Sequence, residues 1–238
     1  PYNIVYMGED DILEELGNYP VRVYPHPVIM DEERAAVLER YVRRGGTLII
    51  GCRSGYKDMN GRCVMLPQPG LLQRLTGSDV RDFTFTSPAE EPVWADFGGE
   101  RIEMPVFNDI LTPLDGATVL AVYGSSYYAG EAAVTEHELG QGKVIHVGSA
   151  FSRQNMKHLF GYTGILEPFK EWIDAPETVE TVMRTKEGKR YLFVLNFQSS
   201  EVEITLHKKA TALYTGKTVQ GRCTMSAYET AVFELCEE

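Results

Sequence analysis

Residues 31–63 read DEERAAVLERYVRRGGTLIIGCRSGYKDMNGRC, and this stretch decides what fold we expect for the first part of the chain. Apolar residues recur at helical spacing among charges over residues 35–42, and Gly45-Gly46 then supplies the left-handed conformation that ends a helix. The apolar run TLII at residues 47–50 is typical of a strand that is covered on both faces. The stretch therefore predicts an amphipathic helix followed by a buried parallel strand.

A polar loop, residues 51–62, leaves this strand at its carboxyl end, where open α/β sheets usually place their ligands. We take four of its side chains as candidate substrate-rim or interface residues: Arg53, Tyr56, Lys57 and Asp58. Two interpretations stay open at this point. These side chains bind a hydroxylated ligand or complete a neighbour's pocket, or they form an internally salt-bridged loop closed by a turn at residues 60–61.

The segments around this stretch predict an alternation of strands and helices. Residues 3–7 and 21–24 have strand patterns, and a short helix that ends at residues 17–18 is expected between them. Such alternation favours an α/β fold with an open, mostly parallel sheet. From Val80 onward, strand-like segments broken by Pro and Gly predict an antiparallel elaboration of that sheet.

Three further elements are expected before a domain boundary. Residues 71–76 predict a short helix ended by Gly77, and residues 132–139 and 143–148 predict a hairpin. Ser149 or Ser152 is expected to cap a last helix that runs through Leu159.

Gly, Pro and aromatic residues then mark a boundary near residue 168, which gives domains 1–168 and 169–238. Six short alternating runs follow the boundary, so the second domain is expected to be a small antiparallel β-sandwich.

Composition restricts the class of protein. The 238 residues are 43% hydrophobic and carry a formal net charge of −11, which disfavours nucleic acid as a partner. No apolar run approaches the length of a membrane span, and we see no secretory signal segment, so we expect a cytoplasmic chain without a membrane partner. The four cysteines show no CxxC spacing, and no phosphate- or dinucleotide-binding glycine motif is present. We therefore predict neither a metal nor a cofactor.

Candidate nucleophiles were sought at the turn after the buried strand. The turn reads GCRSG at residues 51–55, which places neither Cys52 nor Ser54 at the centre of a G-x-S-x-G frame. An amidotransferase-like hydrolase using Cys52 remains a minor alternative. His26 lies between two prolines without a charged neighbour, and His137 and His146 lack a third ligand, so we interpret all three histidines as structural.

Several stretches resemble the non-catalytic part of glycoside hydrolase family 42 β-galactosidases. Residues 37–58 (VLERYVRRGGTLIIGCRSGYKD), with YPHPVIMDEE before them and LPQPGLLQRLTG after them, are similar to the middle domain of that family. GQGKVIHVGS at residues 140–149 continues the similarity. Residues 190–206 (RYLFVLNFQSSEVEITL) and 212–235 (ALYTGKTVQGRCTMSAYETAVFEL) resemble its carboxyl-terminal β-domain.

This resemblance implies a fold and a function. The middle domain of the family is similar to a flavodoxin or class I glutamine amidotransferase sheet without its active site, and it holds subunits together, commonly as homotrimers. The catalytic glutamates of the family lie in a barrel, which would bind most of the galactoside and for which this chain has no room. The resemblance therefore implies a non-catalytic scaffold and oligomerisation region of a retaining β-galactosidase, inactive by itself. The alternative is a stand-alone assembly or carbohydrate-binding protein.

Overall fold

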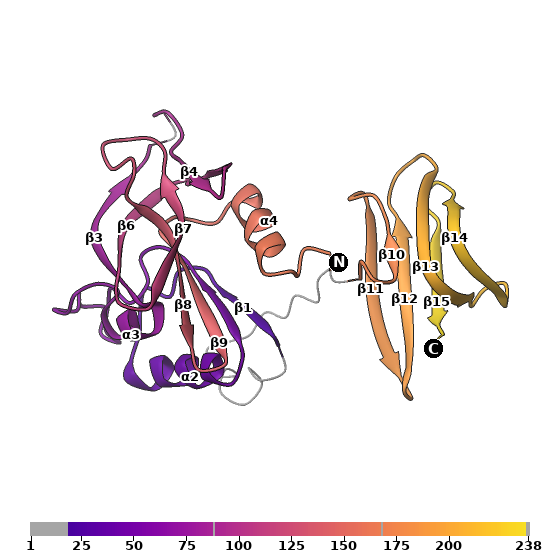
Figure 1. The fold of residues 1–238 in the computed structure, drawn as a ribbon, viewed down its shortest axis with the longest axis horizontal. Helices are drawn as coiled ribbons and strands as arrows, with labels where there is room; N and C mark the ends of the chain where they lie inside the picture. Colours follow the sequence, from indigo (N-terminus) through magenta and orange to yellow (C-terminus); the bar gives the residue numbers. More distant parts are fainter. Residues whose placement is uncertain (1–18, 88, 168, 237–238) are drawn as a thin grey trace. The chain divides into compact units, whose positions relative to one another are not determined.

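The computed structural model describes residues 19–87, 89–167 and 169–236 (Figure 1). These residues form two compact units that divide between Leu159 and Phe160. We call residues 19–159 the first unit and residues 160–236 the second unit. The strand expected over residues 3–7 and the helix expected to end at residues 17–18 lie outside the described residues.

The first unit contains the helix and the parallel strand that residues 31–63 predict. Strand β2 (Thr47–Ile50) pairs in parallel with β1 (Val21–Tyr24) on one side and with β9 (Gly142–Val147) on the other. Helix α2 (Glu32–Arg43) begins at Asp31, whose side chain accepts a hydrogen bond from the N–H of Arg34. The apolar stripe of α2 packs on this part of the sheet, in a core that includes Val37, Leu38, Val42, Leu48, Ile50 and Val144.

Antiparallel strands complete the sheet of the first unit. The nine-stranded sheet has the order β1-β2-β9-β8-β7-β4-β5, and β6 pairs with both β8 and β3. All pairs beyond β9 are antiparallel. These strands are β3 (Ser78–Phe85), β4 (Trp94–Phe97), β5 (Glu100–Glu103), β6 (Phe107–Pro113), β7 (Ala117–Tyr123) and β8 (Ala132–Leu139). The expected hairpin is present as β8 and β9.

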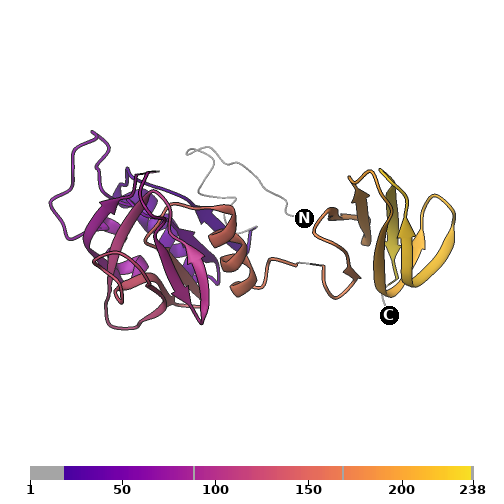
Figure 2. The same cartoon turned by 90° about the horizontal axis from the view of Figure 1, so that it is seen from above.

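The expected α/β class, flavodoxin-like or class I glutamine amidotransferase-like, is wrong. Among the described strands only β1, β2 and β9 pair in parallel, and most strands of the curled sheet are antiparallel (Figures 1 and 2). The described helices of the first unit are α2, the short pair η3 (Gly70–Leu72) and α3 (Gln73–Thr76), and α4 (Arg153–Tyr162), which extends across the division between the units. The alternation in residues 21–50 is local, because short turns join most later strands and such turns make antiparallel pairs.

Two local predictions concern helix ends, and both are confirmed. Gly77 follows α3 in the left-handed conformation, with φ 62°. Ser152 precedes α4, and its hydroxyl accepts a hydrogen bond from the N–H of Asn155 at 3.2 Å, while the Asn155 side chain accepts one from the N–H of Ser152 at 2.9 Å. This reciprocal pair satisfies two backbone donors at the start of the helix.

The second unit is a single curled sheet, so the two-sheet sandwich expected here is also wrong. Its six strands pair antiparallel in the order β10-β13-β15-β12-β11, with β14 on β13. They are β10 (Ile173–Asp174), β11 (Val179–Lys186), β12 (Lys189–Asn196), β13 (Val202–Ala212), β14 (Lys217–Met225) and β15 (Thr230–Leu235). Two of the six expected runs, residues 201–207 and 210–214, fall on β13, and the structure joins them in one strand through a register shift between Leu206 and Ala210. This irregularity lets β13 pair with β10 in its first half and with β15 in its second.

Candidate functional site

The loop of residues 51–62, called the Arg53 loop below, begins directly after β2 and is held by the segment that follows β1. A Cβ on Gly51 would lie 1.9 Å from the carbonyl oxygen of Pro25, so only glycine allows this close approach. The N–H of Gly55 donates to the carbonyl of Pro27 at 2.8 Å, and the buried Ser54 hydroxyl donates to the carbonyl of Gly51 at 2.6 Å. The backbone of the loop is therefore fixed near its start.

Arg53 is the central side chain of the loop. Its backbone has the left-handed φ of 61°, which is uncommon for a residue with a side chain. Its guanidinium carbon lies 3.7 Å from the ring centre of Tyr56, 3.9 Å from that of Phe83 and 5.6 Å from that of Phe107. Such cation–π contacts stabilise the guanidinium in a fixed position. We call Tyr56, Phe83, Phe85 and Phe107 the aromatic face, since Phe85 also contacts Phe107 with ring centres 5.3 Å apart.

A buried carboxylate lies behind Arg53. Asp109, on β6, has no exposed surface, and its Oδ2 accepts a hydrogen bond from the N–H of Arg53 at 2.7 Å. Burial raises the pKa of Asp109 to about 6, although the N–H and guanidinium of Arg53 and the hydroxyl of Tyr56 act in the opposite direction. Asp109 therefore changes charge close to neutral pH, at the point where the loop is attached to the sheet.

Lys57 and Asp58 lie in the outer part of the loop, away from this cluster of contacts. Lys57 is exposed and joins Ile29 and Cys63 through isolated backbone bridges. The Asp58 carboxylate accepts hydrogen bonds from the N–H groups of Asn60 and Arg62, both at 2.9 Å. In residues 19–87, 89–167 and 169–236, none of the ion pairs involves a candidate side chain of this loop. The geometry thus disfavours the salt-bridged interpretation.

Sequence reasoning identified Arg53 and Tyr56 but missed their partners on the sheet. Phe83 and Asp109 are directly opposite each other across β3 and β6. A signal was present in FNDIL at residues 107–111, because an acidic residue within an apolar strand run needs a specific partner when it is buried. The strand pairing that brings this acid to the loop joins residues far apart in the sequence.

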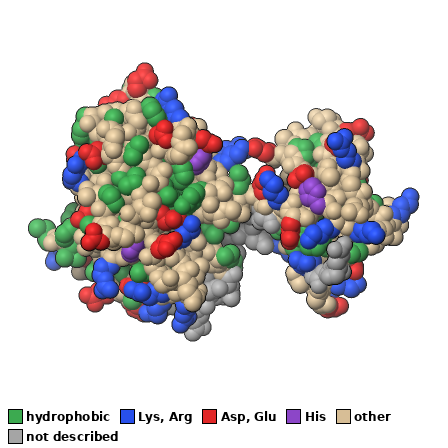
Figure 3. Space-filling view, viewed as in Figure 1, with side chains coloured by type: hydrophobic (Ala, Val, Ile, Leu, Met, Phe, Trp, Pro, Cys, Tyr) green, Lys and Arg blue, Asp and Glu red, His purple; other side chains and the backbone are tan. Residues whose placement is uncertain are grey.

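Large apolar side chains near the loop remain exposed. The exposed fraction is 47% for Phe83, 59% for Phe85 and 98% for Met65. The segment between β2 and η3 projects from the body of the unit in Figure 2, and Figure 3 shows hydrophobic side chains at the surface over β3, β6 and β7. Clustered exposed aromatic rings of this kind mark interaction surfaces.

Cys52 lies next to the loop but is not an activated nucleophile. Its sulfur is 3.8 Å from Nδ1 of His26, and the same nitrogen lies 3.1 Å from the Cys52 carbonyl oxygen. Burial, and secondarily the charge of Asp109, raise the pKa of the Cys52 thiol to about 12. A thiol in this state is protonated at neutral pH and is a poor nucleophile, so the geometry gives no support to the amidotransferase-like alternative.

The two remaining histidines of the sheet have structural partners. His146 is fully buried with Nδ1 2.8 Å from the Ser78 hydroxyl, and Nδ1 of His137 is 3.0 Å from the carbonyl oxygen of Leu75. The described part of the chain holds no group of three or more His, Cys, Asp or Glu side chains suited to a metal ion.

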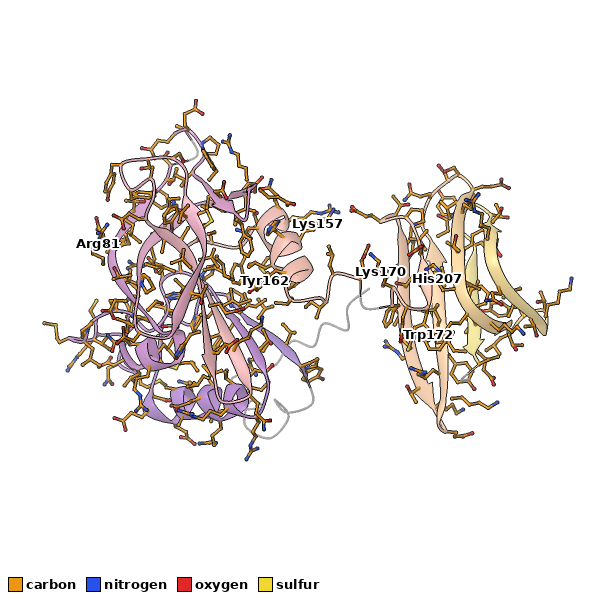
Figure 4. All side chains as sticks on the ribbon, viewed as in Figure 1. Arg81, Lys157, Tyr162, Lys170, Trp172 and His207 are labelled. Carbon is orange, nitrogen blue, oxygen red and sulfur yellow. The ribbon has the colours of Figure 1, made fainter. Side chains whose placement is uncertain are left out.

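The second unit has one notable side-chain cluster. Trp172, labelled in Figure 4, is buried. Arg190 and Lys208 lie over its ring, at 4.8 and 4.2 Å from the ring centre. Its backbone carbonyl accepts a hydrogen bond from the N–H of His207 on β13. These contacts attach the segment before β10 to the sheet, so we interpret the cluster as structural.

The fold and the site define a strand-rich chain of two units: a curled sheet that presents an arginine clamped by aromatic rings, followed by a small β-domain. Residues 10–166 match the family model described as the β-galactosidase trimerisation domain, and residues 178–235 match the β-galactosidase C-terminal domain. The chain belongs to glycoside hydrolase family 42 and corresponds to the C-terminal part of its β-galactosidases.

Known relatives are considerably longer than this chain. It is 31% identical over 202 residues to the β-galactosidase BgaA of Planococcus sp. (strain 'SOS Orange'), a match that covers 82% of this chain and 29% of BgaA. It is 26% identical over 252 residues to the β-galactosidase BglY of Alicyclobacillus acidocaldarius, with 94% of this chain and 34% of BglY covered. The chain thus spans about a third of the length of these curated relatives.

Solved structures show the same architecture. The β-galactosidase from Bacillus circulans sp. alkalophilus has a TM-score of 0.82 and 25% identity, over 94% of this chain and 34% of that one. The β-galactosidase from Rahnella sp. R3 has a TM-score of 0.77 and 20% identity, over 93% and 33% of the two chains. No helix among the described residues has the length and apolar character needed to cross a membrane.

Proposed function

We propose that this chain is the non-catalytic scaffold and oligomerisation region of a β-galactosidase, whose separate barrel domain hydrolyses terminal β-galactosides with retention. The match of residues 10–166 to a trimerisation domain is the observation that carries the proposal. A boundary near residue 168 divides a trimerisation-type domain from the C-terminal β-domain, and the ends of the two family matches at residues 166 and 178 support it. The four cysteines are free, which supports a cytoplasmic location for the parent protein.

The chain alone does not hydrolyse galactosides in this proposal. Retaining hydrolysis needs two carboxyl groups about 5 Å apart in a cleft that holds the sugar ring. The local pairs in the sequence are Glu136 with Glu138 and Glu201 with Glu203. Glu136 forms an ion pair with Lys143 at 2.8 Å, and Glu138 is exposed at the end of β8. A carboxylate neutralised by a lysine beside one exposed to water does not supply the pair of one protonated and one ionised carboxyl group that retention requires.

A chromogenic galactoside tests this point directly. The purified chain at high concentration should release no more product than a heat-treated sample. Turnover that survives repurification, and that disappears when Glu136 or Glu203 is changed to Gln, would show that the chain itself is catalytic.

The aromatic face and the Arg53 loop form the contact surface with further copies of the chain in this proposal, in a homotrimer. Exposed phenylalanines beside a clamped arginine suit a protein interface, where aromatic and arginine side chains provide most of the binding free energy. The net charge of −11 makes general attraction between copies unfavourable, so association requires such a specific apolar contact.

The mass of the chain in solution, measured by light scattering or sedimentation, tests the contact. We expect a trimer that dissociates on Phe85→Ser. Phe197→Ser is the matched control, because Phe197 is 57% exposed in the second unit against 59% for Phe85. Arg53→Ala should also weaken the trimer, whereas Lys57→Ala should have little effect. A chain that is monomeric at all concentrations, or a trimer that Phe85→Ser leaves unchanged, would contradict the proposed surface.

A further inference from the structure

Arg53 carries a positive charge that the described part of the chain does not pair. None of the ion pairs among residues 19–87, 89–167 and 169–236 uses its guanidinium. Its Nη1 is buried and has no hydrogen-bond partner within the same residues. A guanidinium that is withdrawn from water is ordinarily paired with an acid, because the lost hydration is otherwise not compensated. Arg53 is therefore half of an ion pair.

Three acids on the loop, on β3 and on β6 have other partners. The Asp109 carboxylate accepts a backbone N–H of the loop at 2.7 Å, and that of Asp58 accepts two further N–H groups of the loop. Asp82 uses both of its oxygens, since Oδ1 accepts the N–H of Phe83 at 2.8 Å and Oδ2 accepts the hydroxyl of Tyr127 at 2.9 Å. A carboxylate for the guanidinium therefore has to come from outside the described residues.

The aromatic rings hold the guanidinium of Arg53 in a fixed position. Its carbon lies 3.7 Å from the ring centre of Tyr56 and 3.9 Å from that of Phe83, and these two rings are 6.2 Å apart and nearly perpendicular. A cation–π contact acts on the charge of the guanidinium and leaves N–H donors in its plane available. Those donors match the two oxygens of a carboxylate. The arrangement thus prepares Arg53 to receive an acid.

The guanidinium lies at the border between the core and the exposed rings. Tyr56 is buried, with 9% of its surface exposed, whereas the exposed fractions of Phe83 and Phe85 are 47% and 59%. A protein that covers the two phenylalanines also reaches Arg53 and removes water from it. An ion pair formed there has a dry surrounding, in which a charged hydrogen bond is stronger than at an open surface.

We propose that the Arg53 guanidinium binds a carboxylate of a second copy of this chain, in a contact that also covers Phe83 and Phe85. The inference rests on the proposed function and names the chemical group that the partner supplies. Charge favours another copy as the source, because 34 acidic side chains stand against 23 basic ones in each chain. One such pair gives the interface a fixed orientation, which a contact between phenylalanines alone does not.

Two substitutions of Arg53 separate the carboxylate contact from an apolar one, with assembly measured by sedimentation equilibrium. Arg53→Lys keeps the charge but loses the planar donors, whereas Arg53→Met keeps the apolar length but loses the charge. We expect the order Arg, Lys, Met from tightest to weakest assembly. For Arg53→Met, the concentration at which half of the chain is trimeric should rise at least about tenfold. Lys57→Met, in the same loop, is the matched control and should leave this concentration unchanged.

A second measurement needs no variant and so does not depend on how the substitutions fold. Phenylglyoxal modifies arginine side chains, and mass spectrometry reports the rate at each of them. Arg53 should lose most of its reactivity when the chain assembles, while Arg222, 80% exposed in the second unit, should react equally at high and low concentration.

The possible outcomes distinguish this inference from the proposed function. A trimer that Arg53→Met leaves intact and Arg53→Lys weakens has an apolar contact at this position, which overturns the inference alone. Equal reactivity of Arg53 in trimer and monomer overturns it as well. A chain that is monomeric at every concentration contradicts the proposed function, and the inference with it.

Discussion

His146 should make the first unit sensitive to acid, and Asp109 should oppose that effect. His146 lies on β9 with no exposed surface, and its Nε2 has no hydrogen-bond partner among the described residues. Burial lowers the pKa of His146 from 6.5 to about 4, because the imidazolium ion would lose its hydration. Between these two pKa values, His146 is therefore neutral in the folded chain and protonated in the unfolded chain.

The size of the effect follows from the two pKa values of His146. Between pH 6.5 and about pH 4 the unfolded state binds the additional proton, so the free energy of unfolding falls as the pH falls. From about pH 7 to about pH 5, this group should remove about 2 kcal/mol of stability.

Asp109 contributes with the opposite sign. Its pKa is raised from 3.8 to about 6, so the folded state binds the proton first and gains stability as the pH falls through 6. Over the same interval, from about pH 7 to about pH 5, we expect a gain of about 1 kcal/mol. Protonation of Asp109 thus stabilises the folded state as the pH falls and offsets part of the loss from His146.

Urea denaturation at the two pH values measures both contributions. Trp94 fluorescence reports on the first unit in a Trp172→Phe background, because each unit contains one tryptophan. Relative to that background, His146→Gln should remove this loss, so its change in stability between about pH 7 and about pH 5 should be less destabilising by about 2 kcal/mol, whatever the substitution costs at neutral pH. Asp109→Asn should lose about 1 kcal/mol more on acidification than the background. If His146→Gln and the background show the same pH dependence, our assignment of acid sensitivity to His146 is refuted.

Three substitutions test other parts of the argument. Gly51→Ala places a methyl group 1.9 Å from the carbonyl oxygen of Pro25, so the urea midpoint should fall by the equivalent of about 1–3 kcal/mol. An unchanged midpoint would mean that the Arg53 loop does not pack closely on Pro25. Leu48→Ala empties a fully buried site on β2 and should cost about 2–5 kcal/mol in the same assay, and a cost under about 1 kcal/mol would contradict its core position. Ser152→Ala removes the acceptor for the N–H of Asn155 and should lower stability by about 1 kcal/mol, seen also as faster exchange of the first amides of α4.

Signals within short segments of the sequence were sufficient to predict the local elements. Elements α2, β2 and α3 were all predicted from short chain segments. The signals were the helical spacing over residues 35–42, the TLII run and the glycine after each helix. Short-range signals suffice here, because amphipathic periodicity and helix capping act between residues that are close in the sequence. The resemblance to family 42 also came from contiguous stretches, and the family matches confirmed it.

The sheet architecture and the site depend on contacts between distant parts of the chain. Whether two strands pair in parallel or antiparallel depends on the path of the chain between them, so the strand patterns did not reveal that most pairs in the first unit are antiparallel. Nor did they reveal that β13 joins two runs in one curled sheet. Asp109 and Arg53 are 56 residues apart in the sequence, and only the tertiary structure brings the Asp109 carboxylate to the backbone N–H of Arg53. The pKa of Asp109, about 6, follows from that burial, which a pattern of neighbouring residues does not encode.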